Sequence, residues 1–173
     1  TPDPVPGAHF FQRDDEGNPT GWLVEVAAID PVTEALGVIS EEALALAAPG
    51  FFKEMSAVGL TAAFDAGMID TGELGRRLAL KMVEAGEFPV RMVASLYVNQ
   101  PGQLPTALAK LAELNARYHH PLFNVSTLKL SLDGTVEAKT AVMLDPYVLP
   151  EGHTAKPLPP NPGMFDAVAA APE

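Results

Sequence analysis

Apolar positions along the chain predict strands and helices that alternate through its middle. Runs rich in apolar residues at 60–65, 90–98 and 125–133 are typical of buried strands. Between them, leucine and methionine recur at helical spacing over 70–86 and 104–118. Strand and helix alternate about every 30 residues, which is the period of parallel βαβ units. We therefore expect an α/β fold with about three parallel β/α units.

The sequence of residues 1–58 predicts an N-terminal arm that is less regular than the β/α units. A turn rich in charge, glycine and proline at 13–19 separates two short apolar segments, 9–11 and 21–26. Because the turn is short and the flanking segments are apolar, the two segments are expected to pair as strands of a hairpin.

Capping residues mark the start of two predicted helices. Ser40 precedes two glutamates and is expected to be an N-cap, because its hydroxyl accepts a backbone N–H and the helix dipole favours anions in the first turn. Pro49 and Gly50 are expected to break or kink this helix before it ends near Gly59. Asp70 or Thr71 is expected to cap the next helix.

The end of the chain has a different composition. Past Tyr147 it is rich in proline, which predicts an extended C-terminal tail that ends in the start of a helix at 165–171. The predicted organisation is an N-terminal arm over 1–58, β/α units over 59–147 and a proline-rich tail over 148–173.

Composition limits the classes of partner. The 173 residues are 47% hydrophobic, enough for a sizeable core, and their net charge is −11. That charge repels phosphate backbones and anionic lipids, so we expect neither a nucleic-acid nor a membrane partner. The chain contains no cysteine, which removes disulfides and thiolate ligands. It shows neither a long apolar run nor a signal peptide at its start, and a cytoplasmic location is expected.

The last of the three strands has two different faces. Strand alternation separates a leucine face from a polar face: Leu128, Leu130 and Leu132 against Thr127, Lys129, Ser131 and Asp133. A central strand of a doubly wound sheet is apolar on both faces, whereas a strand of a β/α barrel has polar inward positions near its C-terminal end. The pattern therefore favours a barrel. An exposed edge strand whose lysine discourages aggregation remains the alternative.

Lys129 is the candidate for chemistry on this strand. Flanking leucines would desolvate its side chain, which disfavours the ammonium form and frees the neutral amine as a nucleophile. Such an amine can form a Schiff base, act as a base, or add carbon dioxide. The carbamate formed by the last reaction is an oxygen anion able to bridge two metal ions.

Four motifs occur in an order that resembles a known family: Thr20–Glu25 after the turn at 14–19, Gly59–Thr61 leading to Asp65–Gly67, Leu128–Leu130 with Asp133–Gly134, and Thr140–Ala141 with Pro146–Tyr147. Together they look like the middle portion of metal-dependent amidohydrolases, in the branch related to N-substituted formamide deformylase. Members of this branch are often labelled exoenzyme regulatory proteins. The resemblance spans roughly residues 1–150.

This resemblance implies a partial (β/α)₈ TIM barrel with a one- or two-metal centre, zinc being the expected metal. The lysine that matches Lys129 would be carboxylated and bridge the ions, while Asp65 and Asp133 would orient neighbouring residues of the metal centre. The substrate would be a small-molecule amide or cyclic amide. The family's His-x-His pair is expected before Thr1 and its later ligands after Glu173. The chain, which starts without methionine, is therefore expected to be an inactive internal fragment whose metal can be absent.

Other candidate residues have ordinary structural interpretations. Asp65 and Asp133 precede glycines, where a turn or capping role is favoured. His119 and His120 are expected at a helix C-terminus, and His9 and His153 in solvated loops. Trp22 and the phenylalanines are expected in the core.

One segment departs from the family pattern. After Asp133–Gly134 the family has a run of small residues and an arginine, but this chain has Thr135–Lys139. The geometry of this loop is therefore not predicted by the resemblance.

Two other functions remain open. Three parallel strands cannot close a barrel and leave two open edges, which suits a non-catalytic binding or assembly domain that forms a homo-oligomer. A Schiff-base aldolase that uses Lys129 as its amine is the third option.

Overall fold

The computed structural model describes residues 2–4, 10–67, 72–148, 154–155 and 163–170. The chain forms two compact units. Unit 1 comprises Thr1–Leu36, Asn99–Pro101 and Ser131–Glu173, and unit 2 comprises Gly37–Val98 and Gly102–Leu130.

Unit 2 contains a four-stranded sheet in the order β3-β4-β6-β5. Its strands are β3 (Ala62–Asp65), β4 (Arg91–Val98), β5 (His119–His120) and β6 (Phe123–Leu130). β3, β4 and β6 run parallel, and the short β5 pairs antiparallel with the start of β6. The middle parallel strand is therefore β4, and the strand that carries Lys129 lies beside it.

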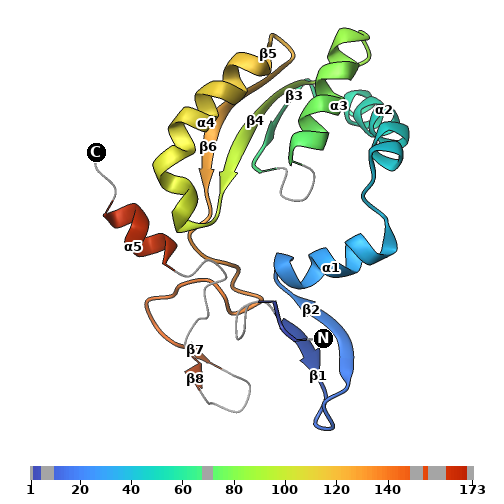
Figure 1. Ribbon diagram of the computed structural model, residues 1–173. Coiled ribbons are helices and arrows are strands. Elements are labelled where there is room, and N and C mark those ends of the chain that lie inside the picture. Colours follow the sequence, from blue (N-terminus) through green and yellow to red (C-terminus); the bar gives the residue numbers. More distant parts are fainter. Residues whose placement is uncertain (1, 5–9, 68–71, 149–153, 156–162, 171–173) are drawn as a thin grey trace. The chain divides into compact units, whose positions relative to one another are not determined.

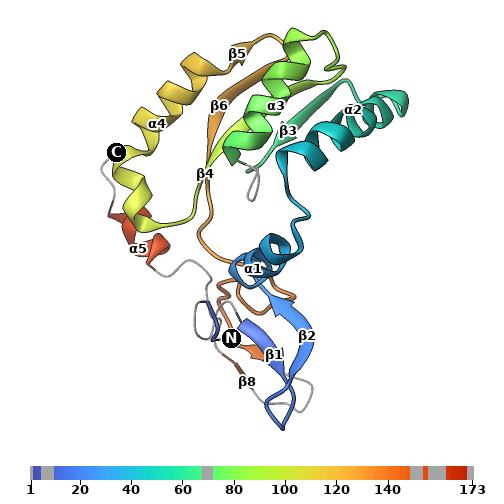
Figure 2. The same ribbon diagram turned by 45° about the vertical axis from the view of Figure 1, so that its right-hand side comes forward.

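Three helices belong to the same unit, and two of them cover one face of the sheet. They are α2 (Glu41–Ala57), α3 (Gly72–Glu84) and α4 (Leu104–Arg117), with the 3₁₀ turn η1 (Pro101–Gln103) just before α4. Buried residues of α3 and α4 form one core with alternate residues of β4 and β6, including Met92, Ala94, Phe123 and Val125. Figures 1 and 2 show α3 and α4 on this side of the sheet.

A β-bulge changes which residues of β6 face that core. Ala94 pairs with Val125, but Ser95 pairs with Thr127, so Ser126 is an extra residue on β6. Without it, Lys129 would share the face of Phe123 and Val125, which lie six and four residues earlier in the strand. With it, the leucines flanking Lys129 pair with Leu96 and Val98 on the core side of β4.

Unit 1 begins with the predicted hairpin. β1 (Phe10–Arg13) pairs antiparallel with β2 (Pro19–Val24), as expected from the turn between them. Asp14 stabilises that turn by accepting the Asn18 backbone N–H at 2.8 Å. This bond from the backbone amide of Asn18 holds the pKa of the Asp14 carboxyl below its usual value.

The rest of unit 1 consists of short elements. They are α1 (Val26–Leu36), β7 (Tyr147–Val148), β8 (Thr154–Ala155) and α5 (Met164–Ala169), with β7 and β8 paired antiparallel. α5 lies where the start of a helix was expected. Much of the predicted tail, and the expected caps Asp70 and Thr71, lie outside the described residues.

The mixed α/β architecture and the parallel strands are confirmed, and they are compatible with part of a β/α barrel. The described strands do not close into a barrel. The expected N-cap is also present, because Ser40 Oγ accepts the Ala43 N–H at 3.1 Å. Within the described ranges no single helix is long and apolar enough to cross a membrane; α1 and α2 reach that length and composition only when counted together across the break between them.

Several local predictions were wrong. Of the break or kink expected at Pro49, the break is absent, because α2 runs through this residue. Helix α1, which contains Pro31, was not predicted. β6 ends at Leu130, three residues before the expected Asp133. The expected position of His119 and His120 near a helix C-terminus is confirmed, because they directly follow α4 and its cap Tyr118, where they form β5.

The expectation that the aromatic residues are core residues holds only in part. Phe88 and Phe123 are buried, but Trp22 is 66% exposed, and Phe51, Phe64 and Phe165 are exposed as well. Large aromatic side chains on short elements of unit 1 and on the β3 edge of the sheet therefore do not have enough neighbours to cover them.

Polar contacts join the helices of unit 2. Glu41 on α2 lies 3.1 Å from Lys81 Nζ and 3.2 Å from Arg77 Nη2 on α3. The hydrogen bond from Lys81, and then the charges of Lys81 and Arg77, lower the pKa of Glu41. Glu73 on α3 accepts the Tyr118 hydroxyl at 2.7 Å, and its carboxylate lies 2.8 Å from Arg117 Nη1.

Tyr118 is fully buried and carries the hydrogen bond that joins α3 to the end of α4. Tyr118→Phe removes this bond to a charged acceptor, so we expect the free energy of unfolding to fall by about 1–2 kcal/mol in urea titrations. Tyr97→Phe is the matched control, because the Tyr97 hydroxyl makes no hydrogen bond among the described residues, and it should leave stability within about 0.5 kcal/mol.

The same bond predicts a pH dependence. Desolvation, and then the bond to Glu73 and its charge, raise the pKa of Tyr118 above its ordinary value of 10.0. A raised pKa in the folded state means that this stabilisation is complete below pH 10 and is lost as pH rises toward the folded pKa. Wild type should therefore lose stability above pH 10 more steeply than Tyr118→Phe. Parallel pH profiles of the two proteins would contradict this assignment.

Candidate functional site at the ends of the parallel strands

Lys129 lies one residue before the end of β6, on the face of the sheet that the helices do not cover. Its register partner on β4 is Tyr97. Leu128 pairs with Leu96, which packs against the core, so alternation directs Lys129 and Tyr97 to the opposite face. The predicted separation of a leucine face from a lysine face is thus present in this part of β6.

The Lys129 side chain is exposed, whereas Tyr97 is half-buried. The desolvation by flanking leucines that we expected is therefore not provided by the described residues, because those leucines face the other way. What unit 2 provides is a primary amine on an open sheet face, near the carboxyl end of a parallel strand.

Ser95 and Thr127 form the register pair that precedes Tyr97 and Lys129 on this face. Ser95 is fully buried, and its hydroxyl donates to the Asp65 carbonyl at 3.0 Å, which fixes the end of β3 against β4. The carboxyl ends of the three parallel strands are therefore held together, as the geometry of a barrel mouth requires.

Asp65 uses its side chain in a turn. Its Oδ1 accepts the Gly67 N–H at 3.1 Å, and its register partner is Ala94, on the core side of the sheet. Asp65 and Lys129 therefore belong to opposite faces.

Asp133 lies in unit 1, where its Oδ2 accepts the Val142 N–H at 2.9 Å. This bond closes the loop between the two residues. The turn roles that the sequence favoured for both aspartates are thus the roles that their hydrogen bonds describe.

A second group of motif residues meets in unit 1. Thr140 is 2% exposed, and its hydroxyl donates to the carboxylate of Glu25, which follows β2 directly. The same Oγ accepts the Thr135 N–H at 3.0 Å, and the Gly134 N–H donates to the Thr140 carbonyl at 3.2 Å. We call Glu25, Gly134, Thr135 and Thr140 the Thr140 cluster.

Glycine is required at position 134 of this cluster because the side chains of Thr140 and Glu25 lie close to its backbone. A Cβ at this position would lie 2.5 Å from Thr140 Cβ and 2.6 Å from Glu25 Oε1. All four residues belong to segments singled out in the sequence, but no role could be predicted for Glu25 and Thr140, because they are 115 residues apart and no local spacing links them.

The described residues do not form a metal site by themselves, because nowhere in the described ranges do three His, Asp or Glu side chains gather as ligands. His120 Nδ1 accepts the Leu122 N–H at 3.1 Å, and His119 is exposed on the same short strand. His9 and His153 lie outside the described residues. Lys129 is the remaining candidate ligand, and it needs a carbamate to become one.

Comparison with known proteins shows a family match over the whole chain. Residues 1–173 match the sequence profile described as "Amidohydrolase family". The chain is also 32% identical over 171 residues to the protein named "Exoenzymes regulatory protein AepA" of Pectobacterium carotovorum subsp. carotovorum. This alignment covers 99% of the chain but 36% of the relative, so the chain spans about a third of that protein's length. No solved structure matches the chain.

The close approach at Gly134 predicts a specific loss of stability. Gly134→Ala forces its methyl group against Thr140 and Glu25. We therefore expect the free energy of unfolding of unit 1 to fall by about 1–3 kcal/mol. Trp22, the single tryptophan, lies in unit 1 and reports this transition by fluorescence in urea. Gly102→Ala is the control, since a Cβ there meets nothing within 4 Å. Equal midpoints for the two variants would show that the contact at Gly134 is absent.

Proposed function

Because the chain belongs to the amidohydrolase family, we propose that it is part of a metal-dependent hydrolase of non-peptide C–N bonds, in amides or cyclic amides. Members of this family are generally metal-dependent. The observation that carries the proposal is the position of Lys129, on the uncovered face and near the carboxyl end of a parallel strand. In β/α barrels this is the end of the strands at which catalytic groups gather.

The proposed role of Lys129 begins with a carbamate. The neutral amine attacks carbon dioxide, so that an N–C bond forms, one C–O π bond opens, and a proton leaves to solvent. The cationic side chain then becomes an anion with two oxygen ligands. This reaction requires an accessible amine, and the exposure of Lys129 in unit 2 satisfies that requirement.

The remaining ligands do not come from the described residues, so a complete centre would need other parts of a longer protein. The relative's greater length is consistent with that. When divalent metal ions such as zinc are bound in such a centre, the chemistry they supply is Lewis-acid activation of the amide carbonyl and of water. On this proposal the chain by itself holds one ligand and does not turn over substrate.

Lys129→Arg tests the proposal in the protein that carries this chain. Arginine keeps the positive charge but does not form the carbamate, so hydrolysis of an N-acyl amine should fall by about 100-fold or more, since even outer-shell partners of a metal act on that scale. A carbamate signal in ¹³C NMR after labelling with ¹³C-bicarbonate should disappear in the same variant. Lys110→Arg, on the exposed face of α4, is the control and should keep both signal and rate.

Three outcomes would overturn this proposal. Full activity of Lys129→Arg would remove the lysine from the mechanism. Turnover by residues 1–173 alone with stoichiometric zinc would contradict the need for outside ligands. Borohydride trapping of a carbonyl compound on Lys129 would assign the Schiff-base chemistry of an aldolase instead.

A second candidate function is a non-catalytic assembly domain, and the sheet edges favour it. β5 pairs only with Phe123 and Asn124, so most of the outer edge of β6 is open, and β3 pairs only with β4 among the described strands. The relative is named as a regulatory protein, which also suits a role without catalysis. On this candidate, two copies of the chain would associate through these edges.

Sedimentation velocity tests the assembly candidate. Residues 1–173 should sediment as a dimer whose fraction rises with concentration, because each copy supplies an open strand edge. Phe64 is 57% exposed on β3, so Phe64→Lys places a charge at that edge and should shift the chain toward monomer. A wild-type chain that stays monomeric at every concentration would exclude self-association through these edges.

A further inference from the structure

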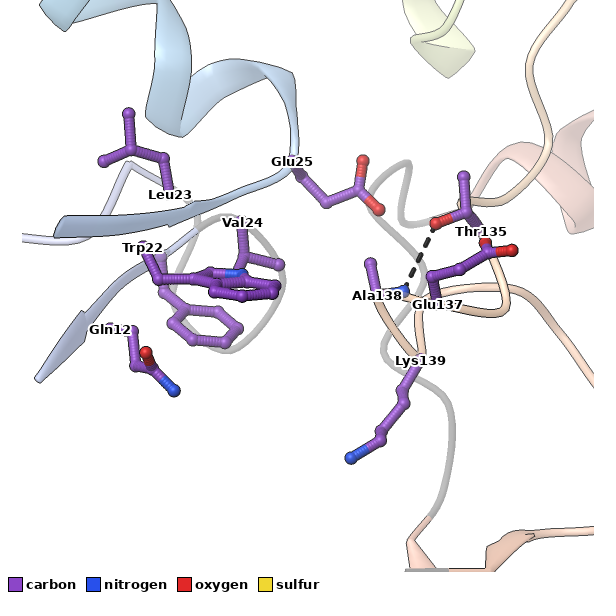
Figure 3. Close-up of a pocket in the computed structure, with 10 residues that line it drawn as sticks. Gln12, Trp22, Leu23, Val24, Glu25, Thr135, Glu137, Ala138 and Lys139 are labelled. Carbon is purple, nitrogen blue, oxygen red and sulfur yellow. Dashed lines mark hydrogen bonds between the residues drawn. The ribbon is translucent and has the colours of Figure 1, made fainter. Parts of the chain in front are cut away.

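Unit 1 contains a pocket of about 430 Å³ that the proposed hydrolase chemistry does not use. Its wall is formed on one side by the β1–β2 hairpin and on the other by the loop at 135–139 (Figure 3). All of its lining residues belong to unit 1. The volume lies within the range of small-molecule sites in proteins.

Aromatic side chains form the hairpin side of this pocket. Trp22 and Phe10 both line it, and Trp22 is 66% exposed although it is the single tryptophan of the chain. In Figure 3 the Trp22 side chain extends from the hairpin toward the loop that carries Ala138 and Lys139. An exposed indole offers a planar apolar surface on which a ring of a ligand can stack.

Lys139 lines the loop side of the pocket, and its own backbone is in a strained conformation. Its φ is +59°, a left-handed conformation that favours glycine or asparagine over lysine. The turn itself is closed by the bond from the Lys139 N–H to the Val136 carbonyl at 3.0 Å, which glycine would make equally well. A lysine at this position therefore adds strain and contributes only its side chain, a combination that is common at functional sites.

The acidic side chains at the pocket do not neutralise this lysine. The Glu25 carboxylate accepts the Thr140 hydroxyl, and in Figure 3 the Glu137 carboxylate points away from Trp22. Lys139 extends toward the side where Gln12 lies, and no ion pair of Lys139 occurs among the described residues. Among the described residues, the pocket thus presents an aromatic surface, an amide and an ammonium group that has no ion-pair partner.

We propose that this pocket binds a small organic anion with a planar apolar body, its ring stacked on Trp22 and its carboxylate held by Lys139. The apolar part of the ligand would cover the exposed indole. The carboxylate would pair with the ammonium group. Gln12, whose Oε1 accepts the Thr20 hydroxyl at 2.8 Å, lines the same pocket and keeps its amide N–H groups as donors. The inference does not depend on the hydrolase proposal, since it uses neither Lys129 nor a metal.

Calorimetric titration of the 173-residue chain tests this site, with 3-phenylpropionate as the probe and 3-phenylpropanol as its neutral counterpart. Wild type should bind the carboxylate about 10-fold more tightly than the alcohol, the effect expected of one charge-assisted contact. Lys139→Gly should abolish that preference while relieving the backbone strain, so its thermal stability should equal or exceed that of wild type. Lys139→Arg should retain the preference within about 3-fold.

Trp22→Phe separates stacking from charge, because it keeps an aromatic ring of smaller area on the hairpin. It should weaken both probes while leaving their ratio unchanged. Unchanged affinity of Lys139→Gly for the carboxylate would overturn the proposal. Equal binding of the two probes by wild type, or no binding of either at millimolar concentration, would overturn it as well.

Discussion

The extra residue in β6 determines what this sheet presents on its two faces. Before Ser126, odd-numbered residues of β6 enter the core with α3 and α4; after it, the even-numbered leucines pair with the core side of β4. Lys129 is consequently placed on the uncovered face beside Tyr97. A lysine in the core would have to lose its charge or find a buried partner, so the bulge makes this position compatible with folding. The same bulge leaves the amine accessible at the carboxyl end of the parallel strands.

Those parts of the fold that depend on local periodicity could be predicted from the sequence. The hairpin, α3, α4 and the parallel strands follow from apolar spacing and turns, and Ser40 caps α2 as its hydroxyl suggests. Proline was misleading at Pro49, because α2 contains this residue and does not end there. A helix tolerates the loss of one hydrogen bond when the rest of its turns remain, and sequence alone does not show that balance.

Around the candidate site, the sequence predicted which residues of one strand share a face. The leucine spacing around Lys129 was sufficient to separate the two faces of the strand. The apolar positions also change from odd to even between Val125 and Leu128, a pattern that indicates the bulge, but the bulge was not predicted from it. Glu25 and Thr140 could not be paired in advance, since hydrogen bonding across a separation of 115 residues leaves no local pattern. Trp22 was misassigned to the core because composition does not show how few neighbours a short hairpin has.

The Thr140 cluster has a consequence for how the chain is made on the ribosome. Glu25 is synthesised before its partner Thr140, which emerges 115 residues later, after every strand of unit 2 has left the exit tunnel. At usual elongation rates this interval lasts on the order of ten seconds. During that time the loop that completes unit 1 has not been synthesised and cannot contact the hairpin and α1. All residues of the β/α units, in contrast, are already present. In the nascent chain, the contact between Glu25 and Thr140 therefore forms only after all of unit 2 has been synthesised.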